Sequence, residues 1–410
     1  MRSFSPAVRL LMLQQFTINT AFYMLMPFLA THLADDLGLA AWSVGLVLGT
    51  RNLCQQGLFL VGGALADRLG CKPVMLAGCA LRTAGFALLG FGVTLPTLLV
   101  AAALTGFAGA LFNPAVRAHL AAEAGERRVD AFALFNIAYQ AGMLLGPVVG
   151  IALLNVDFRL VCTVAAVLFA GLTVAQAYGL RRTVPTRTPG AEGGNWRVVV
   201  ANRPFLLFSA AMTGAYVLTF QLYLALPLRA GAAAPGHEQA LTSALFATSA
   251  LVAVAGQTRI TTWIKSHWTR EQALHRGLML TAGAFTPLLL PAMPTGGGAL
   301  RLAPLFVTTI VLAIGTVVIY PFEMDTVVSL ARNRLVATHY GLYNTICGIG
   351  ITLGNLAIGA LWDTGHPALS WLALTATGLL SALAVAGLSR RGLLRPTPAP
   401  TIGIGISQEA

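Results

Sequence analysis

This sequence has little charge. Of its 410 residues only 10% are charged, whereas 56% are hydrophobic, and the mean hydropathy is +0.75. A soluble domain carries about 25% charged residues, because its surface must be hydrated. The chain has too few charges to cover itself in water. Composition therefore excludes an ordinary soluble protein and predicts one that is dissolved in lipid.

Motifs for chemistry are also missing. The five cysteines are an odd number with no metal-ligand spacing, so neither a disulfide framework nor a metal site is expected. We find no nucleotide-binding P-loop, nucleophile elbow or paired His/Asp cluster. The net charge is +12, but most of the lysines and arginines lie in short gaps between apolar stretches, which weighs against nucleic-acid binding. We expect a protein that is not an enzyme and that uses no cofactor.

Long apolar runs are what the sequence does have. A helix needs about 20 mostly apolar residues to cross a hydrocarbon core of about 30 Å. Continuous runs also exclude the alternating pattern of a barrel strand. We predict an all-α membrane protein with twelve transmembrane helices in two six-helix bundles. The predicted spans are 8–33, 43–66, 74–94, 97–122, 130–153, 158–180, 204–228, 239–263, 276–294, 302–330, 336–361 and 368–388.

The spans divide the chain into four parts. Residues 1–180 form the first bundle, 181–203 a basic linker, 204–390 the second bundle, and 391–410 a tail that is expected to be disordered. Positive charge is concentrated in the gaps on one side of the predicted membrane, which is typical of cytoplasmic loops. We therefore expect both termini and the linker to be cytoplasmic. The first span is too long for a signal-peptide core and is expected to be retained.

The two halves share an internal repeat. The segment that begins at Leu111 resembles the segment that begins at Val318. The matching pairs are Pro114 and Pro321, Arg127 and Arg334, Asn136 and Asn344, Gly142 and Gly350, and Gly146 and Gly354. Related bundles that repeat in parallel are typical of transporters.

One motif lies between the second and third spans. It runs GALADRLGCK and contains Gly63, Asp67, Arg68, Gly70 and Lys72. Its glycines allow close helix packing and a tight turn. Its charged pair lies at the membrane edge, where it can interact with the end of a neighbouring helix.

A second motif lies in the fifth span. It runs GMLLGPVVG and contains Gly142, Gly146, Pro147 and Gly150. Small residues four apart let another helix approach closely, and the proline frees a backbone carbonyl and kinks the helix. Read alone, this pattern is equally consistent with ordinary helix packing.

Together these motifs resemble the major facilitator superfamily. The first matches its loop signature, except at Cys71 where a basic residue is usual, and the resemblance implies that Asp67 and Arg68 act in a conformational switch. The second resembles the antiporter signature of drug–proton exchangers. Three stretches of the N-terminal half, from Arg51, Leu81 and Asp157, look like MdtH-type multidrug exporters.

The resemblance implies a secondary active transporter. It would export small organic molecules, such as drugs or a secreted siderophore, in exchange for protons by alternating access. It would be a monomer in the lipid bilayer of a bacterial inner membrane, with the proton gradient as its energy source. Uptake of a small nutrient and a non-transporting receptor remain alternatives. The arginine often found early in the fourth span of such antiporters is absent, since Ala101 and Ala102 occupy that region.

Two carboxylates inside the tenth span are candidates for proton coupling, Glu323 and Asp325. Being two residues apart, they point in different directions, so at most one is expected to face a cavity. The repeat places Arg117 opposite them. We hypothesise a gate in which Arg117 pairs with either carboxylate when the cavity opens outward. Alternatively, both carboxylates lie near the cytoplasmic surface beside basic loop residues.

Polar residues inside other spans are candidates for the cavity wall. Arg51 and Gln55 share one helix face, because they are four residues apart. Arg82 is expected to be structural. The first and seventh spans, which face the cavity in the superfamily, supply Gln14, Asn19, Tyr23, Tyr216, Gln221 and Tyr223. Any of these side chains could instead only pack against a helix neighbour.

Overall fold

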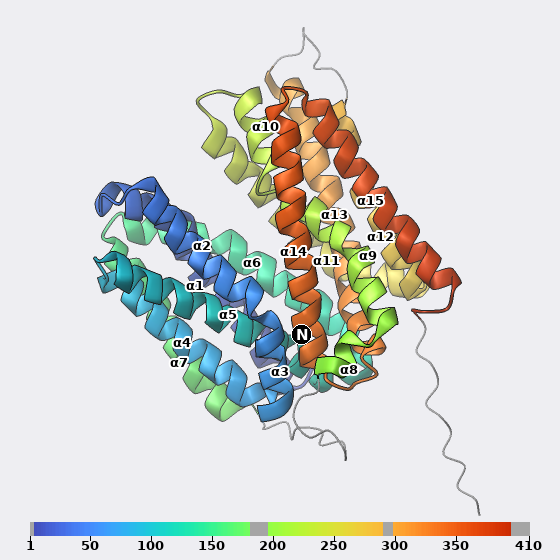
Figure 1. Cartoon of the computed structure of the whole chain (residues 1–410), viewed down its shortest axis with the longest axis horizontal. Helices are drawn as coiled ribbons and strands as arrows, with labels where there is room; N and C mark the ends of the chain where they lie inside the picture. Colours follow the sequence, from blue (N-terminus) through green and yellow to red (C-terminus); the bar gives the residue numbers. More distant parts are fainter. Residues whose placement is uncertain (1–3, 181–195, 290–297, 395–410) are drawn as a thin grey trace, which may run out of the picture.

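The computed structural model describes residues 4–180, 196–289 and 298–394, and its long elements are all helices (Figure 1). The first half contains α1 (Pro6–Thr31), α2 (Ala41–Gly57), α3 (Phe59–Leu69), α4 (Cys71–Phe91), α5 (Leu95–Ala124), α6 (Arg128–Leu154) and α7 (Phe158–Gly179). The second contains α8 (Trp196–Val200), α9 (Arg203–Phe220), α10 (Ala225–Ala233), α11 (Glu238–His267), α12 (Arg270–Gly283), α13 (Gly298–Leu330), α14 (Val336–Asp363) and α15 (Pro367–Arg390).

As far as the described residues go, each predicted span lies on one helix or on successive short helices. Within the described residues, eight helical stretches are long and apolar enough to cross a membrane. One of them, Leu95–Leu154, contains two predicted spans. The all-α architecture is confirmed, whereas twelve separate crossings stay a prediction. Most of the predicted linker and tail lies outside the described residues, although the linker's last part includes α8.

Some predicted spans are interrupted. The second is broken at Leu58, between α2 and α3, and the seventh is broken by a turn between Phe220 and Ala225. The ninth begins earlier than expected, at Arg270, and its α-helix ends at Gly283, before a 3₁₀ turn at Thr286–Leu289. That turn includes Pro287, which cannot donate a hydrogen bond to a continuing helix. Hydropathy alone does not reveal such breaks.

Close helix contacts reproduce the internal repeat. A Cβ atom added to Gly142 would lie 2.5 Å from the carbonyl oxygen of Phe16, so α6 packs tightly on α1. A Cβ atom added to the matching Gly350 would overlap the side chain of Thr213, so α14 packs on α9 in the same way. Each half therefore pairs its fifth predicted span with its first.

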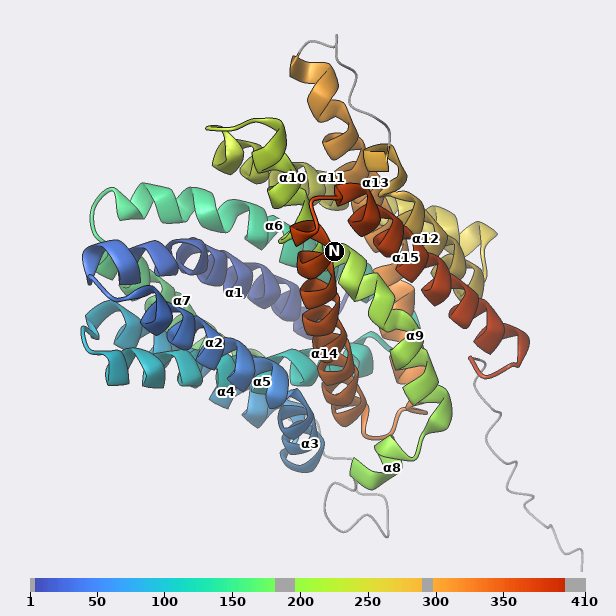
Figure 2. The ribbon, with the colours of Figure 1, turned by 45° about the horizontal axis from the view of Figure 1, so that its top comes forward.

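The two bundles meet at one end and separate toward the other (Figures 1 and 2). Across the junction α14 packs against α3 and α5, while α6 packs against α11 and α13. We call the junction the closed end; it contains Asp67, Asp130, Lys265 and Thr338. The opposite, open end contains the C-terminus of α1 and the N-terminus of α11. This arrangement leaves space between the bundles.

Candidate functional site

A cavity of about 1610 Å³ lies between the two bundles. At the open end its mouth is lined by Thr31, Ile151 and Glu238, which lie at or near helix termini. At its inner end it reaches Arg117 and Glu323. The cavity is larger than the roughly 300–1,000 Å³ typical of pockets for drug-sized ligands. It can therefore hold a sizeable organic molecule.

Most of the predicted wall residues line this cavity. Asn19, Tyr23, Arg51, Gln55 and Tyr216 are on its wall. They come from α1, α2 and α9, which belong to different halves of the chain. Tyr223, in the turn after α9, also lines it.

Gln221 and Gln14 do not line the cavity, contrary to the sequence-based expectation. Gln221 is fully buried and its amide donates to the carbonyl of Val217 and to Asn355. The reason is helix geometry, because Gln221 lies five residues after Tyr216 and therefore points about 140° away from the face that carries Tyr216. Gln14 is also fully buried inside the first bundle.

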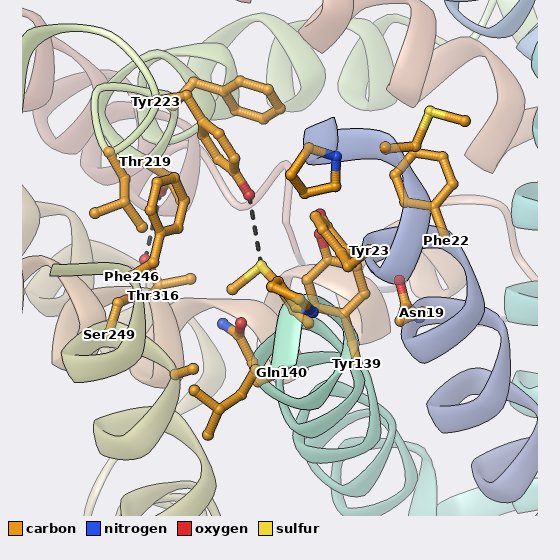
Figure 3. A pocket seen from close by; sticks show the side chains of 18 of the residues that line it. Asn19, Phe22, Tyr23, Tyr139, Gln140, Thr219, Tyr223, Phe246, Ser249 and Thr316 are labelled. Atoms are coloured by element: carbon orange, nitrogen blue, oxygen red, sulfur yellow. Dashed lines mark hydrogen bonds between the residues drawn. The ribbon is translucent and has the colours of Figure 1, made fainter. Parts of the chain in front are cut away.

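Several wall residues were missed by the sequence analysis. On α6, Tyr139 and Gln140 face the cavity, and the Tyr139 and Tyr23 hydroxyls are 2.8 Å apart (Figure 3). Opposite them, the Tyr223 hydroxyl donates to the sulfur of Met143 at 3.6 Å. Asn136, Tyr139 and Gln140 follow helical spacing, so a polar stripe on the fifth span was the available signal.

Glu323 and Arg117 lie at the inner end of the cavity. Glu323 is 3% exposed and accepts a hydrogen bond from the hydroxyl of Tyr343. The guanidinium of Arg117 donates to the side-chain oxygen of Asn344 at 2.9 Å, which joins α5 to α14. A buried carboxyl on the wall of a cavity is the type of group that can exchange a proton with a transport pathway.

The predicted pairing of Arg117 with a carboxylate is not what the structure shows. Asp325 lies outside the cavity and accepts from Nε of Arg128 at 2.8 Å and from Arg270 at 3.5 Å. Among the described residues, no ion pair joins Arg117 to Asp325 or Glu323. A helix turns about 100° per residue, so Glu323 faces the cavity and Asp325 does not.

Asp67 holds the closed end together. Its carboxylate accepts from the backbone N–H groups of Ala337 and Thr338, at 3.2 and 2.7 Å, and from the Thr338 hydroxyl at 2.6 Å. These groups form the N-terminus of α14, where a negative charge is favoured by the helix dipole. Nearby, a Cβ atom on Gly63 would overlap the Ala337 carbonyl oxygen. The glycine permits the approach that the aspartate stabilises.

The other residues of this loop motif act elsewhere. Lys72 donates to the carbonyl oxygens of Ala177 and Leu180, at 2.7 and 2.6 Å, and so binds the C-terminal end of α7. Gly70 has φ of 92°, a conformation that favours glycine. Arg68 is exposed at the end of α3.

Two further polar contacts cross between the bundles. The amide of Asn136 on α6 donates to Gln257 on α11 at 2.7 Å, in a buried position. Lys265 pairs with Asp130 at 2.7 Å near the surface. The closed end is therefore a set of contacts between the halves that must break together if the bundles rock apart.

The glycines of the second motif pack α6 against α1. A Cβ atom added to Gly146 would lie 2.7 Å from Cβ of Tyr23, and one added to Gly150 would overlap the carbonyl oxygen of Met24. Pro147 lines the cavity. The motif thus forms a tight helix contact beside the cavity wall.

Comparison with protein families matches residues 11–355 to the Major Facilitator Superfamily. The chain belongs to the major facilitator superfamily. An uncharacterised transporter of this superfamily from Mycobacterium tuberculosis strain H37Rv is 51% identical over 396 residues, covering 95% of this chain and 94% of the relative. Multidrug resistance protein MdtH of Shigella dysenteriae is 30% identical over 381 residues, covering 92% of each chain.

The fold agrees with this superfamily. A crystal structure of a mutant of the peptide transporter POT superposes with a TM-score of 0.68 and 17% sequence identity, covering 95% of each chain. Superfamily membership makes this chain a multi-pass membrane transporter for small molecules and not an enzyme. The MdtH-type resemblance of the sequence is confirmed by this match over 92% of each chain.

Proposed function

We propose that this transporter exports amphipathic organic molecules in exchange for protons. The observation that carries the proposal is a cavity between two bundles that opens at one end and has a buried carboxyl at its inner end. Aromatic and amide side chains on its wall suit molecules with an apolar body and a polar group. Glu323 is the proposed proton site and Asp67 the proposed latch of the closed end.

We assign the closed end to the cytoplasm. It carries Lys72, Arg128, Lys265 and Arg270, in agreement with the positive-inside distribution. The structure then represents a conformer that opens away from the cytoplasm. In the proposed cycle a proton enters from the side away from the cytoplasm and binds Glu323. The contacts of the closed end then break. The cavity opens to the cytoplasm, where it releases the proton and takes up the next molecule.

The export direction is supported by the MdtH relatives, whose name states multidrug resistance. It can be tested in inside-out membrane vesicles that contain the protein and are energised by respiration, which acidifies the lumen. A fluorescent amphipathic dye should accumulate in these vesicles, and nigericin, which collapses the pH gradient, should abolish accumulation.

Vesicles from cells without the protein are the control. Gradient-dependent dye loss from the lumen would reverse the proposed direction and favour nutrient-type uptake. Accumulation that survives nigericin and depends on the protein would contradict proton exchange.

A further inference from the structure

Two arginines lie on the same wall of the cavity, in the first bundle. Arg51 comes from α2 and Arg82 from α4, and both line the cavity. The sequence pattern favoured a structural role for Arg82. Charged side chains inside membrane spans are costly, and those that persist face a partner or a functional pathway. The surroundings of the two arginines decide between a structural and a functional role.

One aromatic ring positions both guanidinium groups. The Arg51 guanidinium carbon lies 4.6 Å from the centre of the Phe22 ring, and that of Arg82 lies 5.8 Å from the same ring. Arg82 also lies 5.4 Å from the centre of the Phe169 ring. Such cation–π contacts hold the charges in place without neutralising them. Phe22 itself faces the cavity (Figure 3).

Neither arginine has a carboxylate partner. Within the described part of the chain, no ion pair includes Arg51 or Arg82. Arg51 donates to the amide oxygens of Asn52 and Gln55, at 2.8 and 2.7 Å, while its Nε is buried with no hydrogen-bond partner. Arg82 is only 6% exposed. Two positive charges therefore lie on the wall with hydrogen-bonding capacity left over.

Positive side chains outnumber negative ones on the described wall of the cavity. Arg117 is a third arginine on its wall, and the carboxylates among the described lining residues are Glu238 and Glu323. Glu238 is at the mouth and exposed. Glu323 is on the opposite bundle, hydrogen-bonded to Tyr343. The inner cavity thus favours a negatively charged guest over a positively charged one.

We propose that Arg51 and Arg82 bind the anionic group of the transported molecule, with Phe22 and the tyrosines of α1 and α6 against its aromatic body. The substrate class is then an aromatic carboxylate, sulfonate or phosphate. Guanidinium groups match the geometry of these anions and form their strong, charge-assisted hydrogen bonds. The inference rests on the proposed function, because it assumes that this cavity holds the transported molecule.

The test compares two probes of nearly the same size and shape, the anionic 2-naphthoate and the uncharged 2-naphthamide. Both are radiolabelled and dialysed to equilibrium against the full chain in lipid nanodiscs, and binding to empty nanodiscs is subtracted. The wild-type protein should bind the carboxylate at least about tenfold more tightly, as expected for charge-assisted hydrogen bonds. Arg51→Gln and Arg82→Gln should each remove most of that preference, while Arg51→Lys should keep part of it.

Arg259→Gln is the matched control. Arg259 is an exposed arginine on α11 that does not line the cavity, so its loss should leave the preference unchanged. Binding of the uncharged amide shows that each variant is folded. If Arg82→Gln binds neither probe, the variant is misfolded and Arg51→Gln alone decides the test. Arg51 is half-buried and lies beside polar residues, so its replacement should not unfold the protein.

Equal binding of the two probes by the wild type, or an unchanged preference in Arg51→Gln, would overturn the anion site. A loss of preference in Arg259→Gln would also overturn it, because the preference would then come from the overall positive charge of the protein and not from the cavity. Since binding is measured without a gradient, it is independent of the vesicle experiment. Charge-selective binding without proton-driven transport would overturn the proposed function and leave the anion site intact.

Discussion

At the residue scale, the position of each carboxylate on α13 separates two tasks. Glu323 faces the cavity and bonds Tyr343, whereas Asp325 bonds Arg128 and Arg270 at the closed end. Two residues along one helix thus place one acid in the transport pathway and the other in the junction between the bundles. Only the first is in a position to bind a proton in exchange for the cargo.

We therefore predict different effects for the two neutral variants. Glu323→Gln should reduce proton-driven transport to the level of vesicles without protein, because the amide cannot release a proton. Its substrate exchange without a gradient should stay within a factor of about three, since glutamine retains the shape and can still bond Tyr343. Radiolabelled exchange and pH-driven uptake measured on the same proteoliposomes separate the two effects.

Asp325→Asn is the matched variant and should remain proton-coupled. Full proton-driven transport by both Glu323→Gln and Asp325→Asn would exclude these carboxylates from coupling. Loss of coupling in Asp325→Asn alone would move the proton site to the closed end.

At the scale of elements, glycine spacing decides which helices touch. Gly142, Gly146 and Gly150 all present backbone surface to α1, with the closest approach at the Met24 carbonyl. Small residues four apart are the usual means of bringing membrane helices close, because no hydrophobic effect drives them together in lipid. The motif that resembles an antiporter signature therefore acts here first as a packing surface.

Gly150→Ala should destabilise the first bundle. Its Cβ would overlap the Met24 carbonyl oxygen, a contact that requires helix displacement. Overpacking of this kind costs about 1–3 kcal/mol. Thermal unfolding in detergent should show a lower midpoint for this variant.

Gly171→Ala on α7 is the control, since a Cβ there would meet nothing within 4 Å. It should unfold at or slightly above the wild-type midpoint, because alanine favours a helix by about 1 kcal/mol over glycine. An unchanged midpoint for Gly150→Ala would show that α1 and α6 are farther apart than described.

At the scale of the whole molecule, the contacts of the closed end stabilise the conformer that the structure describes. Magnitudes distinguish its contacts. Asp67 accepts three hydrogen bonds from α14, and bonds to a charged group contribute about 1.5–3 kcal/mol each. The Lys265–Asp130 pair is partly exposed, and exposed pairs contribute about 0.2–1 kcal/mol. The proposed latch at Asp67 is therefore stronger than this pair.

Asp67→Ala should open this end far more often than Lys265→Ala. Spin labels at the exposed positions Glu126 and His267, which lie on opposite bundles, would report the distance between the bundles by pulsed electron paramagnetic resonance. In Asp67→Ala we expect a second, longer distance between the labels to become the major one. The ratio of its population to that of the short distance should be about tenfold or more higher than in the wild type. Lys265→Ala should shift the populations by only a few-fold. Equal shifts in the two variants would contradict Asp67 as the main latch.

Much of this architecture could be predicted from the sequence. Hydropathy located the long helices, the repeat related the halves, and the glycine motifs indicated close helix contacts that the structure describes at Gly142 and Gly350. The cavity positions of Tyr23, Arg51 and Tyr216 followed from helix face and family resemblance. The break after Phe220 has no hydropathy signal, and neither does the buried contact of Gln221 with Asn355.

The sequence by itself determined that this protein lives in lipid, because so few charges cannot hydrate a surface, and that it has two related halves. Only the tertiary structure decided which side chains become partners in hydrogen bonds and ion pairs. Asp67 meets Thr338, 271 positions away, and Arg128 rather than Arg117 meets Asp325, because two rigid bundles dock in one orientation. The packing of α4 within the first bundle likewise turns Arg82 toward the cavity. A local pattern shows the face of a helix, and only packing between helices shows what that face meets.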